Sequence, residues 1–245
     1  MTMLNSSTDI FPILALGVDI RHIANMAFRP HPSLYEGWQD EAGIDPLVWG
    51  NAVVGGGVVA RDTLEPPYLK VLVNANGPLD EATLYGLQRW YCAPDPSEAN
   101  YLEQFIIRRT HFEFVAKLTL ANLIDNTRFF MGFGFAQNVD EASPNIIGFV
   151  MDNADNLLAI CADVAGFFTE PFLAAADALD WHKYHIEVRE GHVRFDLDDV
   201  ELASIAANAP NFSMYPVFHI VQENNPGMCL IEVSALRIWH EDALL

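Results

Sequence analysis

The sequence predicts an all-β protein, built as one antiparallel β-sandwich with an extended arm at its N-terminus. From residue 68 onward, apolar and polar residues alternate with a period of two, which is the pattern of half-buried strands. Clusters of Asn, Asp, Gly and Pro separate these segments at the short intervals that are typical of sandwiches and barrels. At 245 residues, the chain suits a single large sandwich better than two small domains.

The clearest predicted strands lie at residues 111–120 and 128–135. The first has one polar and one apolar face, and the apolar face consists of Phe112, Phe114, Ala116, Leu118 and Leu120. In the second, Gly132 and Gly134 lie on the face opposite to the main apolar residues. Because glycine has no side chain, we predict that these outward glycines leave space for a bulky group across the strand.

A hairpin is predicted around Glu190-Gly191, between strands at 181–189 and 192–198. The first of these strands turns Tyr184, Ile186 and Val188 toward the core, and its outward face carries Lys183, His185, Glu187 and Arg189. The second strand turns Val193, Phe195 and Leu197 inward.

Other segments complete the predicted sandwich. Further strands are expected at 68–73, 82–90, 146–151, 157–161, 200–203, 215–221 and 229–239. Residues 165–179 are predicted to form a longer connection, with a short helical turn at residues 174–176.

The first part of the chain differs from the rest. Residues 1–34 contain Pro12, Pro30 and Pro32 and show weak periodicity, so they are predicted to form the arm, and residues 35–245 the sandwich domain. The apolar stretch 10–18 has no basic residue before it and no small-residue cleavage site after it, which makes it a poor signal peptide. We therefore expect the protein to be made and folded in the cytoplasm. The three cysteines form no disulfide framework or zinc pattern and are expected to be free thiols.

Charge excludes some partners. Asp and Glu number 33 against 13 Lys and Arg, for a formal net charge of −20. Nucleic acids and anionic membranes require a basic surface, so neither is expected as a partner. The mean hydropathy is nevertheless positive. Two interpretations stay open: an apolar surface hidden in a homo-oligomer or larger assembly, or a large core.

The most specific sequence pattern is Trp-His-x-Tyr-x-Ile-Glu at 181–187, followed by Gly-x-Val-x-Phe-x-Leu-Asp at 191–198. With the strands from residue 105 to about 240, it resembles the concanavalin A-like lectin/glucanase jelly rolls, including the laminin-G-like modules of phage structural proteins. The resemblance implies a jelly-roll fold, but this fold hosts lectins, glycosidases, lyases and scaffolds, so it implies no function. Asp199 stands where such modules usually carry glycine; Asp tolerates the left-handed conformation.

No catalytic residue is predicted. The glucanases of this fold carry two carboxylates on one strand as Glu-x-Asp-x-x-Glu, and this sequence has no such motif. Asp196 and Asp198 share a strand face, but they belong to the hairpin, where a solvated face is the simpler explanation. His182 and His185 should lie on opposite faces and cannot bind one metal. The expectation is therefore a protein that is not an enzyme.

Loop carboxylates are candidate calcium ligands. Asp152, Asp155, Asp198 and Asp199 could supply oxygen ligands. Turn chemistry explains each cluster by itself. No cofactor is predicted, and calcium stays open as an alternative.

Four aromatic residues are candidates for sugar binding: Trp38, Trp49, Trp90 and Tyr91. They lie in the less regular region, where rings can be exposed. The alternative is that these rings cap the sandwich.

The predicted function is that of a non-catalytic structural or assembly protein, such as a phage virion component at the virion surface, in the form of a capsid decoration or tail-associated module. A jelly roll without catalytic carboxylates, preceded by an arm and lacking a secretion signal, favours this hypothesis. The alternative is a carbohydrate-binding module, with or without calcium, whose partner is a glycan. A glycoside hydrolase or polysaccharide lyase comes last.

Overall fold

The computed structural model confirms the all-β sandwich. It describes residues 33–36, 44–62, 70–75, 79–88, 90–91, 106–120, 127–135, 143–151, 156–163, 166–174, 180–189, 192–206, 213–222 and 229–244. The sandwich belongs to the compact unit Leu34–Leu245. Residues 1–32 of the predicted arm lie outside the described residues, so the arm stays a prediction, and its last two residues begin strand β1. Within the described part no helix occurs, so none there could cross a membrane.

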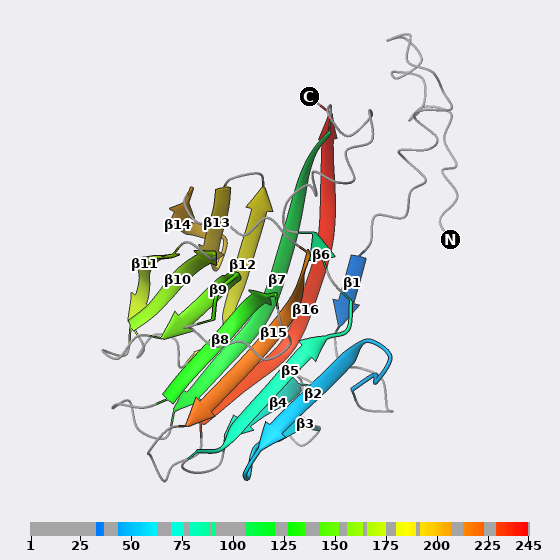
Figure 1. Cartoon of the computed structure of the whole chain (residues 1–245), viewed down its shortest axis with the longest axis vertical. Coiled ribbons are helices and arrows are strands. Elements are labelled where there is room, and N and C mark those ends of the chain that lie inside the picture. Colours follow the sequence, from blue (N-terminus) through cyan, green and yellow to red (C-terminus); the bar gives the residue numbers. More distant parts are fainter. Residues whose placement is uncertain are drawn as a thin grey trace. The chain divides into compact units, whose positions relative to one another are not determined.

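Two antiparallel sheets make up the sandwich (Figure 1). In sheet A the strand order is β14-β13-β12-β7-β16-β4-β3, and β1 also pairs with β16. The strands of sheet A are β1 Ser33–Glu36, β3 Val58–Asp62, β4 Lys70–Ala75, β7 Ile106–Leu120, β12 His182–Arg189, β13 His192–Leu197, β14 Val200–Ile205 and β16 Cys229–Leu244.

In sheet B the strand order is β11-β10-β9-β8-β15-β5-β2, and β6 also pairs with β15. The strands of sheet B are β2 Trp49–Val54, β5 Glu81–Gly86, β6 Trp90–Tyr91, β8 Thr127–Gly134, β9 Ile146–Met151, β10 Asn156–Asp163, β11 Gly166–Ala174 and β15 Ser213–Gln222.

The inner faces of the two sheets form one core. Phe112 and Phe114 of β7 are at most 1% exposed. They contact Phe218 from sheet B, with ring centroids 5.8 and 5.2 Å apart, and Phe114 also stacks on Tyr184 at 5.2 Å. The predicted inward residues of β7, β12 and β13 that the structure describes are therefore confirmed. Cys161 and Cys229 are buried free thiols, as expected, and burial raises the pKa of Cys161.

One predicted connection is wrong. The sequence predicts an irregular segment at 165–179, but Gly166–Ala174 forms strand β11, which pairs with β10 at the edge of sheet B. Pro171 argues against a strand in the sequence, because proline cannot donate a ladder hydrogen bond. At a sheet edge this loss is tolerated, since one side of the strand has no partner strand.

Among the described strands, β7 and β16 of sheet A form the longest pairing and run side by side in Figure 1. Their antiparallel register runs from Cys229↔Leu120 to Leu244↔Ile106, with an irregularity between Val233 and Ala235. Its length places residues from two distant parts of the sequence side by side, including Trp239 opposite His111.

The outward glycines allow a close approach of two strands. Gly132 of β8 lies directly opposite Gly148 of β9. A Cβ atom on Gly132 would overlap the Ile147 carbonyl oxygen and lie 2.5 Å from Gly148 Cα, and one on Gly148 would lie 2.5 Å from the Met131 carbonyl oxygen. Backbone atoms of the neighbouring strand thus occupy the space beside Gly132, which corrects the interpretation of this glycine as room for a bulky group.

The turn between β13 and β14 places Asp198 and Asp199 in the left-handed region, with φ of 51° and 67°. Asp199 therefore adopts the left-handed conformation that aspartate is expected to tolerate. The Asp198 carboxylate accepts hydrogen bonds from the Lys183 backbone N–H at 2.9 Å and from His182 Nδ1 at 2.7 Å. Asp199 contacts the Lys183 ammonium, and this hydrogen bond raises the pKa of Lys183. Partial burial pushes the pKa of Asp198 upward, but the bonds from Lys183 and His182 outweigh it and lower that pKa.

We predict that Gly148→Ala lowers the free energy of unfolding by about 1–3 kcal/mol, because the added methyl group meets backbone atoms that cannot move freely. Urea unfolding followed by tryptophan fluorescence measures the change. The control is Asn51→Ala, which removes an exposed side chain on β2 and should change stability little. Equal stability of Gly148→Ala and the parent protein would contradict the close approach.

A second prediction concerns acid stability. Because the folded-state pKa of Asp198 lies below its ordinary value of 3.8, its contribution is complete above that value and lost as the pH falls through the lower folded value. Asp198→Asn should therefore be less stable than the parent at pH 6, and the difference should shrink toward pH 2. Urea midpoints across this range measure it. In the control Asp199→Asn the effect should be smaller, because the Asp199 side chain is 78% exposed. A deficit independent of pH would refute the assignment.

Candidate functional site

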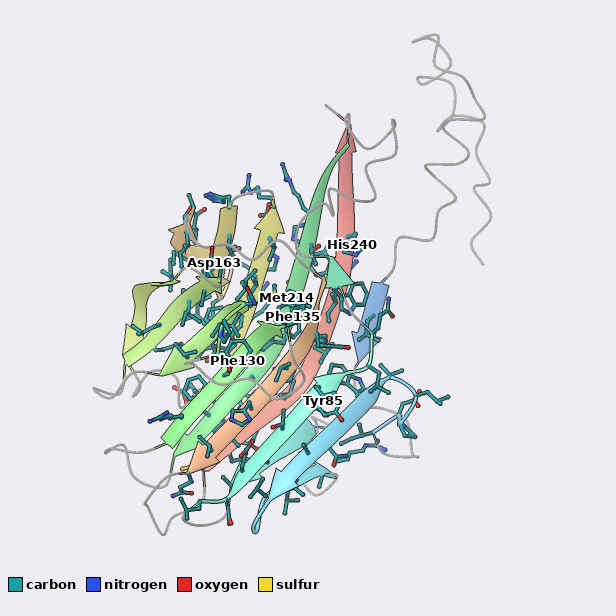
Figure 2. All side chains as sticks on the ribbon, in the orientation of Figure 1. Tyr85, Phe130, Phe135, Asp163, Met214 and His240 are labelled. Carbon is teal, nitrogen blue, oxygen red and sulfur yellow. The ribbon has the colours of Figure 1, made fainter. Side chains whose placement is uncertain are left out.

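The outer faces of the two sheets differ in chemistry. The outer face of sheet B carries an apolar cluster, at most 3% exposed, made of Phe130, Ile146, Val150, Ile160, Ala162 and Val217. Figure 2 labels Phe130 on β8 and Tyr85 on β5, the latter packing against this cluster. Thr83 and His219 form a polar pair there at 2.8 Å, with Glu81 3.8 Å from His219.

The outer face of sheet A gathers charged, imidazole and indole groups in two neighbouring cross-strand rows. One row runs across β14, β13, β12, β7 and β16 as Glu201, Asp196, His185, Glu113 and Arg237. The next row runs across the same strands as Ser204, Arg194, Glu187, His111 and Trp239. We call these ten residues the polar face. They point outward because the alternate residues of the same strands lie in the core.

A chain of hydrogen bonds crosses three strands of the polar face. Asp196 is 4% exposed, and its Oδ2 lies 2.8 Å from Nδ1 of His185. Nε2 of His185 lies 3.1 Å from Nδ1 of His111, which is 6% exposed. The second carboxylate oxygen of Asp196 accepts a hydrogen bond of 2.7 Å from Arg194 Nε. Both oxygens of Asp196 therefore have protein partners.

Glu187 is a buried carboxylate between two arginines. It is 6% exposed, and its Oε1 lies 3.3 Å from Arg189 Nε and 3.7 Å from Arg109 Nε. These are ion pairs without a hydrogen bond of good geometry, and Oε1 has no hydrogen-bond partner among the described residues. The two arginine side chains remain about one-third exposed, at 34% and 33%. An incoming hydroxyl group would find guanidinium donors here, whereas the Glu187 Oε1 atom is itself buried from solvent.

Trp239 provides a flat apolar surface beside these groups. Its ring stacks on His111 with centroids 4.6 Å apart and planes 6° apart. The guanidinium of Arg237 lies 4.5 Å from the indole centroid. Trp239 is only partly buried, so part of the ring reaches the surface. Trp239 is not among the aromatic residues that the sequence predicts for sugar binding. Its position next to inward Ile238 on the predicted strand 229–239 does indicate an outward ring.

The predicted sugar-binding aromatics lie elsewhere. Trp49 and Trp90 are 2% and 1% exposed and belong to the core, so their rings offer no face to a sugar. The ring centroid of Trp90 lies 5.4 Å from that of His240, which Figure 2 labels on β16. Tyr91 pairs through its backbone with Ser213, and Trp38 lies outside the described residues.

The predicted calcium ligands are not brought together by what the structure describes. Asp198 and Asp199 bind His182 and Lys183, and Asp152 and Asp155 lie outside the described residues. In the described part of the chain, no three His, Cys, Asp or Glu side chains are grouped to hold a metal. Calcium stays an untested prediction.

Comparison with known proteins gives a match in structure alone. No family model matches the sequence, and no curated protein matches it. A β-1,3-glucanase from Mycobacterium marinum superposes with a TM-score of 0.59 at 13% identity, over 86% of this chain and 100% of that one. A β-glucanase from Bacillus licheniformis gives 0.57 at 10% identity, over 86% and 99%. A glycoside hydrolase family 16 protein from Bacteroides ovatus, in complex with a G4G4G3G product, gives 0.59 at 9% identity, over 84% and 99%.

These neighbours correct the functional prediction. They are carbohydrate-processing enzymes, which contradicts both the non-catalytic structural protein and the expectation that the chain is not an enzyme. The phage virion context finds no support in them. At such low identity the likeness establishes the fold and no activity. The chain has the concanavalin A-like jelly-roll fold seen in the glucanases of glycoside hydrolase family 16.

Proposed function

We propose that this protein is a carbohydrate-processing enzyme that binds a glycan on the polar face of sheet A. The observation that carries the proposal is a buried carboxylate, Glu187, diagonal to a partly exposed one, Glu113, beside the indole of Trp239. The glucanase neighbours support a glycan as the partner, which was among the partners predicted from the sequence.

The two carboxylates are neighbours on the polar face. Glu187 lies opposite His111, and Glu113 lies opposite His185, so the two glutamates are diagonal neighbours on adjacent strands. The other diagonal of this quartet is the hydrogen-bonded His111–His185 pair, which lies between the two glutamates. A sugar that contacts both carboxylates would therefore lie across this imidazole pair.

The two carboxylates also differ in environment, as an acid–base pair requires. The Glu187 side chain is 7% exposed and lies between Arg109 and Arg189, which stabilise its anion, so we assign it to attacking the sugar carbon. The Glu113 side chain is 36% exposed and is reached by water, and we assign it proton transfer to the departing glycosidic oxygen. Lys183 Nζ lies 4.0 Å from Glu113 and can pair with its carboxylate once the proton has been transferred.

The surrounding groups suit a sugar ring. The exposed part of the Trp239 indole can pack against the apolar C–H face of a pyranose. Arg109 and Arg189 offer guanidinium donors at the surface next to the unsatisfied oxygen of Glu187. The corresponding face of sheet B carries a buried apolar cluster among the described residues.

We predict that the protein binds and cleaves a glycan from a panel of β-1,3-, β-1,4- and mixed-linkage glucans. Glu187→Gln and Glu113→Gln should each lower turnover by about 100-fold or more while binding persists, because the loss falls on proton transfer or attack. Trp239→Ala should weaken binding instead. Reducing-sugar release and calorimetric titration measure the two effects.

The matched control is Glu232→Gln. Glu232 is also 6% exposed and lies on the outer face of sheet A, where it accepts a hydrogen bond from Thr119. It lies seven residues before Trp239 on β16, roughly 20 Å away along the strand. This variant should retain both binding and turnover. Failure of the wild-type protein to bind or cleave a broad glycan panel would remove the proposal, as would an equal loss in the control.

A further inference from the structure

We propose that Asp196, His185 and His111 form a proton relay in which His111 exchanges one proton with the polar face. The relay is a property of the side-chain network, whereas its use in turnover rests on the proposed glycan-processing function. Glu187 and Glu113 are both outside the relay, so the relay adds a further proton-transfer group to the site.

The geometry of the two imidazoles supports a direct hydrogen bond. Their planes differ by 2°, their centroids are 5.3 Å apart, and the facing nitrogens are 3.1 Å apart. Parallel rings with these separations lie side by side in one plane, as an N–H···N hydrogen bond along the ring plane requires. Trp239 covers this plane, stacking on His111 at 4.6 Å and lying parallel to His185 at 6.0 Å.

Proton counting then assigns both tautomers. An ionised Asp196 can only accept, so His185 Nδ1 must carry the proton that it donates to Asp196. With both imidazoles neutral, His185 Nε2 is therefore an acceptor, and His111 must donate from its own Nδ1. His111 Nε2 is then the unprotonated nitrogen of that ring. Asp196 thus fixes, through His185, which nitrogen of His111 is basic.

The relay can take up a proton without placing two cations side by side. A proton added at His111 Nε2 allows the His111 Nδ1 proton to move to His185 Nε2. The imidazolium charge then lies on His185, whose Nδ1–H donates to the Asp196 carboxylate. One proton enters, one N–H bond is gained overall, and one positive charge results.

Neighbouring groups define the electrostatics of this network. Asp196 is held on its other oxygen by Arg194, so its charge is shared between a guanidinium and an imidazole. The charged groups on the same face of the packed strands, Asp196 aside, include Arg109, Glu113, Lys183, Glu187, Arg189, Arg194, Glu201 and Arg237. They come from five adjacent strands of sheet A.

The other described histidines make a different kind of contact. Each of them has an oxygen partner: Asp198 for His182, Ser204 for His192, Thr83 for His219 and Thr110 for His240. These contacts can orient a ring, and the partner in each of these four hydrogen bonds is an oxygen. The His111–His185 hydrogen bond instead joins two imidazoles, so the second ring can accept the displaced proton.

The relay is tested first by proton NMR of the full chain labelled with ¹⁵N-histidine, at neutral pH. We expect the His185 and His111 Nδ1–H protons downfield of the other imidazole N–H signals, slowed in exchange with solvent. Asp196→Asn and His111→Gln should remove or shift the His185 signal. The control His192→Gln, on the same sheet face, should leave both signals in place. A wild-type spectrum in which His185 Nδ1 carries no proton overturns the relay and requires no variant to fold.

A second measurement separates the relay from the proposed function. On a glycan that the protein cleaves, His111→Gln should lower turnover by about 100-fold and remove one limb of the pH profile, with binding little changed. Asp196→Asn should alter the same limb, whereas Glu232→Gln should not. Normal turnover and an unchanged pH profile in His111→Gln would overturn the catalytic use of the relay. The NMR signals without activity on any glycan would uphold the relay and remove the proposed function.

Discussion

The pairing of β7 with β16 is the constraint on which the rest of the structure depends. In this register Phe112 and Ile238 lie opposite each other in the core, and His111 and Trp239 lie opposite each other outside it. Because side chains alternate with a period of two, a slip by one residue would exchange these sets. Such a slip would expose the phenylalanines and bury charged groups, so the hydrophobic core fixes the arrangement of the polar face.

The polar face carries an energetic cost that points to a role beyond stability. Glu187 and Asp196 are almost fully buried, and buried carboxylates are tolerated only where cations or donors compensate them. Arg109, Arg189 and Arg194 supply that compensation, yet the Glu187 Oε1 atom keeps no hydrogen bond among the described residues. Apolar side chains would avoid this cost, as they do in the buried cluster on the corresponding face of sheet B.

The expectation of a non-catalytic protein rested on the absence of one local motif. A search for Glu-x-Asp-x-x-Glu follows one strand, where alternation directs its carboxylates to one side. The proposed pair instead combines Glu113 of β7 with Glu187 of β12, which are 74 positions apart in the sequence and diagonal in the sheet. No local motif can indicate such a pair, because it depends on the register between non-consecutive strands.

The sequence by itself determined the β class, the inward faces of β7, β12 and β13, and the outward direction of His185 and Glu187, because these depend on a two-residue period that is local. It also indicated the turn at Asp198 and Asp199, whose side chains tolerate positive φ. Only the tertiary structure decided that β7 lies between β12 and β16, that Trp49 and Trp90 are buried, and that Trp239 lies beside His111. These outcomes depend on which distant strands pair. The free energy that stabilises this pairing comes from contacts throughout the core, and no short segment of the sequence determines it.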